Sequence, residues 1–253
     1  MPHFFISSNN ANAGALTVNA PETVHHIANV LRVKTGETVK FIDQNEIQYI
    51  TKITGVSKKE IRAEIIKSEK STRKLKHNIY LAQSVLKNEA QGLLISNAAQ
   101  LGIKGVYPFI SDYSTAKKTA GIRCEKWQKI ADEAFKQCER ADKMQVFNAL
   151  SLNEILSKFK KENIIIFAEK DSNCKIFEAV QDIKDNSEIL IVIGPEGGFS
   201  DMEFDFFKNR GYKMVSLGNL IFKAPNAVTA GAANVIFALD LKDQISQNKP
   251  QRQ

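Results

Sequence analysis

The stretch EILIVIGPEGGFS, residues 188–200, decides the fold of this protein. After Glu188 it is a run of apolar strand formers that leads into a turn with glycines, a proline and an acid. In open α/β sheets ligands bind at such a turn, because exposed backbone amides and a helix start meet at the carboxyl end of the strand. Neither familiar phosphate loop fits: no lysine follows Gly198, and the third glycine of the dinucleotide fingerprint is absent. The turn alone predicts either a ligand site or an ordinary tight turn.

Two patterns of secondary structure divide the chain. Short strands dominate up to about residue 70, and they surround a single helical stretch, which is typical of a small barrel. From residue 78 strands alternate with helices, which predicts a mainly parallel sheet. In the first part we expect strands at 2–6, 37–43, 47–54 and 60–68 and a helix at 22–31. In the second we expect strands at 78–85, 105–109, 163–168, 188–193 and 213–217 and helices at 89–101, 125–140, 152–160, 176–183, 201–209 and 225–241.

The same patterns set the expected domain boundaries. Residues 71–77 are dense in charge and have no apolar periodicity, so they are interpreted as a linker. We therefore expect a barrel over 1–70, an α/β domain over 78–242 and a polar, disordered tail over 243–253. The helix expected at 225–241 is apolar nearly all round, which predicts burial in a core or against a second subunit.

Composition narrows the class of protein. Hydrophobic residues make up 43% and charged residues 25% of the 253, as in ordinary globular proteins. The start of the chain does not resemble a signal peptide and no long uncharged apolar stretch occurs, so a cytoplasmic protein without a membrane partner is expected. The three cysteines are widely spaced, and adjacent His25 and His26 would point about 100° apart on a helix, so no metal site is expected.

The charge of +7 is unevenly distributed along the chain. Residues 1–75 contain eleven lysines and arginines against seven acids, whereas the remainder is nearly balanced. A basic leading module favours a polyanionic partner, and nucleic acid fits better than a membrane because no basic amphipathic helix is present. Simple solubility is the alternative explanation of the same charge.

Several motifs together resemble the ribosomal RNA small subunit methyltransferase E family of the SPOUT superfamily. The most specific is Gly-Pro-Glu-Gly-Gly at 194–198, followed by Leu217-Gly218 some twenty residues later. Further matching stretches are Phe4-Phe5, 25–37, 98–103, Tyr107-Pro108 and 132–140. The resemblance implies an α/β protein in which a small N-terminal PUA-like β-barrel precedes a trefoil-knotted SPOUT domain with a mainly parallel sheet. It also implies a homodimer that binds S-adenosyl-L-methionine and methylates N3 of a uridine in 16S rRNA of the small ribosomal subunit, with no role for DNA.

Carried onto this sequence, the resemblance implies three groups of site residues. The cofactor pocket would consist of Phe167, Ala168, Glu169, Gly194, Pro195, Glu196, Gly197, Gly198, Leu217, Gly218, Ile221 and Phe222. Glu196 could instead cap the following helix. Arg140 and Lys223 would assist catalysis, and His25, Arg32 and Lys34 would contact RNA.

The chain departs from the family pattern in one helix and one loop. In the helix the family usually has Lys-Ala-Thr-Glu-Leu-Gly, whereas residues 97–102 are Asn-Ala-Ala-Gln-Leu-Gly and lack both charges. In the loop the family usually has Leu-Gly-Pro-Arg-Ile-Leu-Arg followed by Thr-Glu-Thr, whereas this chain has LGNLIFK at 217–223 followed by Ala224-Pro225-Asn226. Leu220 thus replaces an arginine, and Lys223 keeps a charge without the planar fork of an arginine. Two alternatives follow: a catalytically weak RNA-binding or assembly factor of the same fold, or a methyltransferase with another RNA target.

Overall fold

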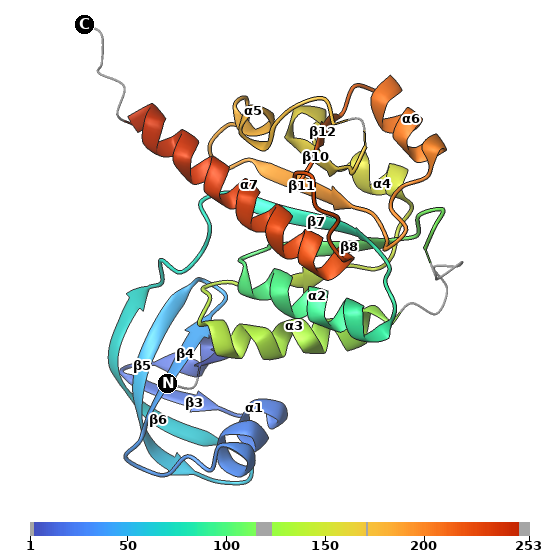
Figure 1. Cartoon of the computed structure of the whole chain (residues 1–253). Helices are drawn as coiled ribbons and strands as arrows, with labels where there is room; N and C mark the ends of the chain where they lie inside the picture. The colour runs from blue at the N-terminus through green and yellow to red at the C-terminus, as the bar shows by residue number, and fades with distance from the viewer. Residues whose placement is uncertain (1–2, 115–122, 171, 248–253) are drawn as a thin grey trace, which may run out of the picture. The chain divides into compact units, whose positions relative to one another are not determined.

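The computed structural model describes residues 3–114, 123–170 and 172–247, and the chain folds as two compact units (Figure 1). The first contains residues 1–74 together with 135–142, and the second contains 75–134 and 143–253. The elements of the first unit are β1 (His3–Ile6), β2 (Ala11–Asn12), β3 (Ala15–Val18), α1 (Pro21–His25), a π-helical turn (His26–Val30), β4 (Thr38–Asp43), β5 (Ile47–Val56) and β6 (Ile61–Lys70).

The first unit is built on a strongly bent antiparallel sheet. Among the described residues the strand order is β1-β4-β5-β6-β3-β2, and only the β1–β4 pair is parallel. Its core includes Phe4, Leu16, Ile27, Phe41 and Ile61, which are all buried. The predicted strands and helix of this part are confirmed, but the β2–β3 hairpin, whose strands have two and four residues, was missed.

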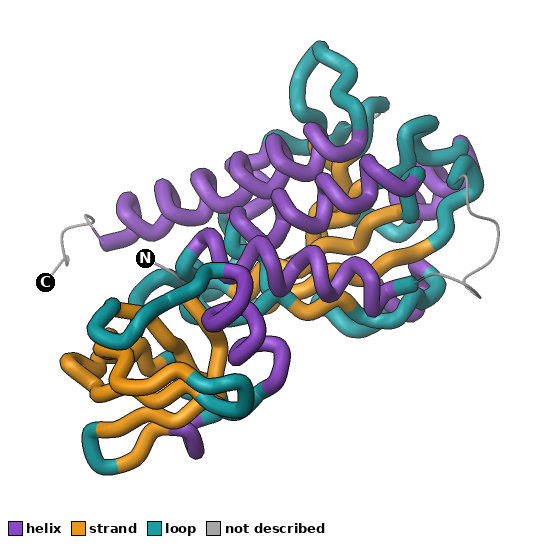
Figure 2. Tube along the Cα trace, turned by 90° about the horizontal axis from the view of Figure 1, so that it is seen from below, coloured by secondary structure: helices purple, strands orange, loops and turns teal. Residues whose placement is uncertain are grey.

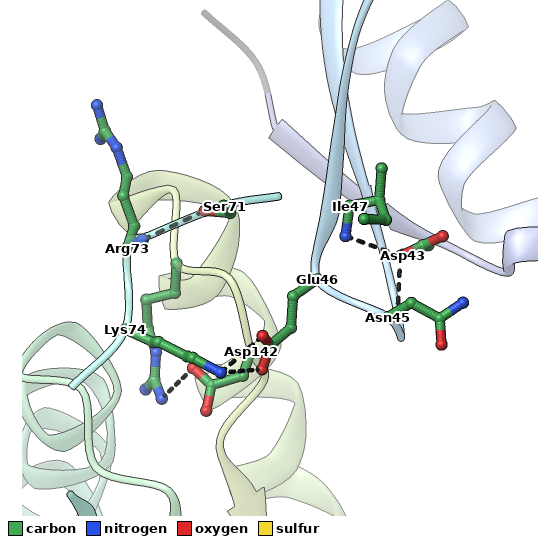
Figure 3. A network of polar contacts seen from close by, with 9 residues as sticks. Asp43, Asn45, Glu46, Ile47, Ser71, Arg73, Lys74 and Asp142 are labelled. Carbon is green, nitrogen blue, oxygen red and sulfur yellow. Dashed lines mark hydrogen bonds and ion pairs between the residues drawn. The ribbon is translucent and has the colours of Figure 1, made fainter. Parts of the chain in front are cut away.

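One turn of this unit is held by side chains, as Figure 3 shows. The Asp43 carboxylate accepts hydrogen bonds from the backbone amides of Asn45 and Ile47, at 2.9 and 3.0 Å. Lys74 pairs with Glu46 of the same turn, with Nζ 2.6 Å from Oε2. The β4–β5 connection is therefore tied to the residues that leave the barrel.

The second unit is a parallel sheet covered on both faces. Among the described residues its strand order is β12-β10-β11-β7-β8-β9, with every pair parallel. Its strands are β7 (Asn78–Ser84), β8 (Gly105–Phe109), β9 (Gln145–Val146), β10 (Ile164–Phe167), β11 (Glu188–Ile193) and β12 (Lys213–Val215). Its helices are α2 (Asn88–Gln100), α3 (Cys124–Cys138, whose end belongs to the first unit), α4 (Leu152–Leu156), α5 (Ile176–Val180), α6 (Asp201–Asn209) and α7 (Ala224–Gln247).

The alternation of side chains along the strands produces two hydrophobic cores. Ile165 and Ile191 belong to the core under α2, α3, α5 and α7, whereas Ile166 and Val192 face α4 and α6. Figures 1 and 2 show α2 and α7 side by side over the first of these faces, where the Asn97 side chain donates to Thr229 Oγ1 at 3.1 Å. Because both faces are covered, the central strands are apolar at successive positions.

The predicted tail boundary is wrong at its start. α7 continues to Gln247, so residues 243–247 are helical. The reason is that Asp243 is buried, with its carboxylate 2.8 Å from Lys76 Nζ, which attaches the last turns of the helix to the domain. Residues 248–253 of that predicted tail lie outside the described part of the chain.

Candidate active site

A cavity of about 430 Å³ opens at the carboxyl edge of the second sheet. The strands β10, β11 and β12 end together there, because Phe167 is in register with both Ile193 and Val215. The loops that follow these three strands, with the start of α7, form most of the wall. The lining residues are Phe167, Ala168, Glu169, Ser172, Ile193, Gly194, Pro195, Gly198, Phe199, Phe204, Val215, Ser216, Leu217, Gly218, Asn219, Leu220, Ile221, Phe222, Ala224 and Ala227.

Glycines shape two of these loops. Gly198 has φ +71° and closes a turn by donating its amide to the Pro195 carbonyl at 3.0 Å. Gly218 has φ +103° in the loop after β12. Only glycine adopts such angles without steric cost, and at these two positions the wall of the cavity is backbone.

A buried side chain from a neighbouring strand fixes the glycine turn. Gln83 of β7 is fully buried, and its Nε2 donates to the Gly194 carbonyl at 3.0 Å and to the Ser84 carbonyl at 2.8 Å. Sequence reasoning missed Gln83 because the pairing of β7 with β11 is not visible in the sequence. A polar residue near the end of an otherwise apolar strand was the available signal.

The helix after the turn begins with a reciprocal cap. Ser200 Oγ accepts from the Glu203 amide at 3.2 Å, and Glu203 Oε2 accepts from the Ser200 amide at 2.9 Å. Ser200 is thus the N-cap of α6. Glu196 does not cap this helix and its side chain is exposed. The cap stabilises α6 close to the cavity, since Phe199 and Phe204 on either side of it line the wall.

The cavity has little charge. Among its lining residues Glu169 is the single ionisable group, and the others are apolar, small or neutral polar. Such a site suits an extended, largely apolar ligand that carries a positive charge and hydrogen-bonding groups, because exposed backbone can satisfy the latter. The lining itself supplies no cation for a phosphate.

The structure brings together most of the predicted cofactor residues. All of those on the loops after β10 and β12 line the cavity, and so do Gly194, Pro195 and Gly198. Glu196 and Gly197 do not, because the turn directs them away from it. Their predicted contact with the cofactor stays a prediction.

The two predicted catalytic residues lie in different surroundings. Lys223 is exposed and directly follows the lining residue Phe222. Arg140 belongs to the first unit, where it is buried and its Nη2 lies 3.0 Å from Asp142 Oδ1. Arg140 is not part of the cavity wall, and its role in catalysis remains a prediction.

The predicted RNA-binding residues are exposed on the first unit. His25 is the last residue of α1, and Arg32 and Lys34 follow the π-helical turn. Arg32 has φ +53°, an uncommon value for a residue with a side chain, and exposed Val30 and Leu31 precede it. Backbone strain and exposed apolar groups beside cations are consistent with a binding surface.

One cluster of side chains outside the cavity has the composition of a metal site. The ligand atoms of His77, Asp185 and Asp243 lie within 4.8 Å of one another, but Lys76 Nζ is already 3.2 and 2.8 Å from the two carboxylates. Lys76 thus supplies the positive charge of that cluster.

No helix in the described part of the chain is long and apolar enough to cross a membrane.

Comparison with known proteins relates both units to one class of enzyme. An RNA methyltransferase domain family matches residues 73–236, and an RNA methyltransferase PUA domain family matches residues 18–66. The ribosomal RNA small subunit methyltransferase E of Aquifex aeolicus is 30% identical over 233 residues, which cover 90% of this chain and 96% of that protein. The protein of the same name from Rickettsia conorii is 26% identical, with 91% of this chain and 93% of that protein covered.

A solved structure agrees with these sequence matches. The crystal structure of a ribosomal RNA small subunit methyltransferase E from Neisseria gonorrhoeae, bound to S-adenosyl methionine, has a TM-score of 0.79 and 26% identity. The match covers 92% of this chain and 95% of the Neisseria gonorrhoeae chain. The predicted α/β fold with an N-terminal PUA domain is confirmed.

Proposed function

This chain belongs to the ribosomal RNA small subunit methyltransferase E family of RNA methyltransferases, and on that premise we propose that it transfers a methyl group from S-adenosylmethionine to N3 of a uridine in 16S rRNA. The observation that carries the proposal is the cavity at the ends of β10, β11 and β12, whose walls are the loops with the family motifs. Such an enzyme would act in the cytoplasm, where small ribosomal subunits are assembled.

The cavity fits the cofactor in size and in chemistry. Its volume of about 430 Å³ lies within the usual range for small-molecule sites. Phe167, Leu217 and Phe222 offer apolar surface for an adenine ring, and the single acid, Glu169, offers a carboxylate to hydroxyl or ammonium groups. The glycines at 198 and 218 leave backbone accessible to the same ligand. S-adenosylmethionine supplies a methyl group bonded to a positively charged sulfur.

The chain's own contribution is to align the uridine and to manage its charge. The N3 proton of uracil must leave before or as the nitrogen attacks, and its loss places negative charge on N3 and the ring oxygens. That charge is cancelled as the bond from N3 to the methyl carbon forms and the bond from carbon to sulfur breaks, which would release neutral S-adenosylhomocysteine. Alignment of nitrogen, methyl and sulfur supplies most of the acceleration available to such a site. Because the cavity wall contains no lysine or arginine, the cation that stabilises the oxygens comes from beside it. Exposed Lys223 and Lys170 each directly follow a lining residue, and Lys223 lies in the loop with the family motif.

The first unit would recognise the RNA. The match to a PUA domain and the exposed cations Arg32 and Lys34, with His25 nearby, support this assignment. Contacts of lysine and arginine with phosphates provide affinity that falls with salt. Under this proposal residues 1–70 bind RNA and residues 78–242 carry out the transfer, with 71–77 as the linker.

The enzyme would work as a homodimer. On α7 the apolar side chains of Phe237, Leu241 and Ile245 are exposed at a spacing of four residues, and Phe237 is 67% exposed. Exposed apolar stripes of this kind usually mark a protein interface. Replacement of Phe237 by lysine should convert a dimer to a monomer in sedimentation equilibrium, and a monomeric wild-type chain would disprove this part.

The weak-catalyst alternative rests on Leu220. It lines the cavity and is 76% exposed, so a long apolar side chain stands in the mouth where the family usually has arginine. If this change limits turnover, Leu220→Arg should raise kcat. A wild-type chain that binds the cofactor and the small subunit without turnover would favour the alternative.

The deciding experiment is methyl transfer to small ribosomal subunits that lack the modification. Labelled S-adenosylmethionine is the donor, and mass spectrometry identifies the methylated nucleoside and its position. A single 3-methyluridine in 16S rRNA is expected. Cofactor affinity measured by calorimetry on the same preparation distinguishes failure of the pocket assignment from failure of the target assignment.

A further inference from the structure

An exposed aromatic ring stands beside the glycine turn of the cavity. Tyr113, in the loop that follows β8, is 57% exposed to solvent. A Cβ atom added to Gly197 would lie 3.3 Å from Tyr113 Cβ and 3.8 Å from its Cγ and Cδ2. The missing side chain of Gly197 therefore makes room for Tyr113, whereas Gly194 and Gly198 of the same turn line the cavity.

The backbone around Tyr113 is fixed by buried hydrogen bonds. Ser114 Oγ lies 2.6 Å from Ser84 Oγ and accepts from the Ser111 amide at 2.8 Å. Ser111 Oγ donates to Glu203 Oε2 at 3.0 Å, and Ser200 is hydrogen-bonded to Asp112. The Tyr113 turn is thus joined to β7 and to the cap of α6, and it keeps its place relative to the glycine turn.

Several buried serine hydroxyls thus form the hydrogen bonds that hold the Tyr113 turn, although the Tyr113 side chain itself is mostly exposed to solvent. An exposed aromatic ring costs hydrophobic free energy that burial would recover, so a rigid exposed ring close to a site indicates contact with a partner. Asp112 directly precedes Tyr113, and its backbone amide donates to Glu203 Oε1 at 3.4 Å, so two acids belong to this turn and would repel phosphates. The partner surface that suits this position is the uncharged face of a nucleobase.

We propose that Tyr113 stacks on a base of the RNA strand that carries the target uridine and thereby positions that strand at the cavity. The inference rests on the proposed function and adds a residue for substrate recognition. A base presented to a cavity must be unstacked from its neighbours, and an aromatic side chain replaces part of the stacking that is lost. Tyr113 is a positioning residue, since it is not part of the cavity wall.

The test is steady-state methylation with modification-free small subunits as the varied substrate and saturating S-adenosylmethionine. Because stacking on an aromatic side chain contributes to the binding of each base, Tyr113→Ala should raise KM for the subunits by roughly tenfold. Tyr113→Phe keeps the ring and should behave as wild type, whereas Tyr113→Leu should resemble Tyr113→Ala. Cofactor affinity should not change in any of the three variants.

Phe177→Ala is the matched control, because Phe177 of α5 is also an exposed aromatic, at 39%. The tenfold factor for Tyr113→Ala should be the same at low and high salt, whereas the effect of Lys34→Ala should shrink as salt rises. Wild-type KM in Tyr113→Ala would overturn the inference and leave the proposed function intact. If the wild-type chain does not methylate the subunits, the test is the equilibrium Kd of the subunits for wild type and for each Tyr113 variant. Equal Kd values for wild type and Tyr113→Ala would overturn the inference.

Discussion

Gln83 Nε2 donates a hydrogen bond to the carbonyl oxygen of Gly194 at 3.0 Å. The bond connects β7 to the first residue of the glycine turn after β11, and it lies entirely in the interior. The position of the turn therefore depends on a side chain more than a hundred residues away in sequence.

Gln83→Leu should weaken cofactor binding. The variant leaves the buried Gly194 carbonyl without its donor, which costs about 1–3 kcal/mol, and the turn relaxes. We expect the Kd for S-adenosylmethionine, measured by calorimetry, to rise about tenfold. Tyr80→Phe is the control on the same strand, since Tyr80 bonds Glu188 away from the cavity, and it should keep the wild-type Kd. Equal Kd values for Gln83→Leu and wild type would contradict the role given to Gln83.

Gly231→Ala should weaken cofactor binding while it leaves the stability of the fold nearly unchanged. A Cβ atom at Gly231 of α7 would lie 3.1 Å from Cζ of Phe167, whose ring lines the cavity. The ring must shift, so cofactor affinity should fall several-fold, while the helix gains about 0.5–1 kcal/mol from the loss of glycine. The displacement of the tightly packed Phe167 ring opposes this gain, so the free energy of unfolding measured in urea should change little.

Gly92→Ala provides the comparison for that variant. Its added Cβ would meet only Ile130 Cδ1 at 3.4 Å, an ordinary contact. This variant should gain stability of about 0.5–1 kcal/mol and keep the wild-type cofactor affinity. If both variants bind the cofactor normally, Phe167 does not need its present position.

Asp243→Asn should destabilise the protein at neutral pH and much less in acid. Burial alone would raise the pKa of Asp243, but its hydrogen bond with Lys76 and the charges of Lys76 and His77 outweigh burial and lower the pKa from its ordinary value. A carboxyl with a lowered pKa stabilises the fold above its unfolded-state pKa, and this stabilisation disappears as pH falls through the folded-state pKa. At pH 7 we expect a loss of about 1–2 kcal/mol in urea unfolding.

The difference between Asp243→Asn and wild type should shrink below about pH 4, where the unfolded carboxyl takes up its proton. Asp185 also pairs with Lys76, at 3.2 Å, but its side chain is 66% exposed. Asp185→Asn should therefore lower the free energy of unfolding by well under about 1 kcal/mol. A loss for Asp243→Asn that does not depend on pH would show that the charge of Asp243 is not what stabilises α7.

His3→Leu should flatten the dependence of stability on pH. Burial lowers the pKa of His3 from 6.5 to about 4, and the charges of Glu139, Lys40 and Arg73 modify this shift. The unfolded chain binds a proton in this window and the folded chain does not, so stability falls as pH drops from 6.5 to about 4. The titration of His3 can lower the free energy of unfolding by up to about 3 kcal/mol over this pH range.

Urea unfolding at several pH values tests this prediction. The His3→Leu variant should lose less stability than wild type between neutral pH and about pH 4, and its curve should be displaced most in the acidic half of the window. Parallel curves for His3→Leu and wild type would show that His3 is not protonated on unfolding.

The sequence by itself determined the main strands and helices and their order, and it placed a glycine turn after residues 188–193 that suits a ligand site or an ordinary tight turn. Strand alternation, the cap at Ser200 and the left-handed glycine at 198 depend on neighbours within a few residues, so they are visible in the sequence. The family motifs added the chemistry. The same local signals did not reveal β2, β3 or β9. β2 and β9 have two residues each, too few to show a period, and β3 has four.

Only the tertiary structure decided which residues of the motif face the cavity. The register of β10 with β11 and β12 brings three loops to one edge, and the hydrogen bonds of Gln83 and Ser114 set the turn so that Gly198 lines the cavity and Gly197 packs on Tyr113. These contacts join segments far apart in the chain. The physical reason is that a local pattern specifies the conformation of a turn, whereas its neighbours depend on how the strands pair.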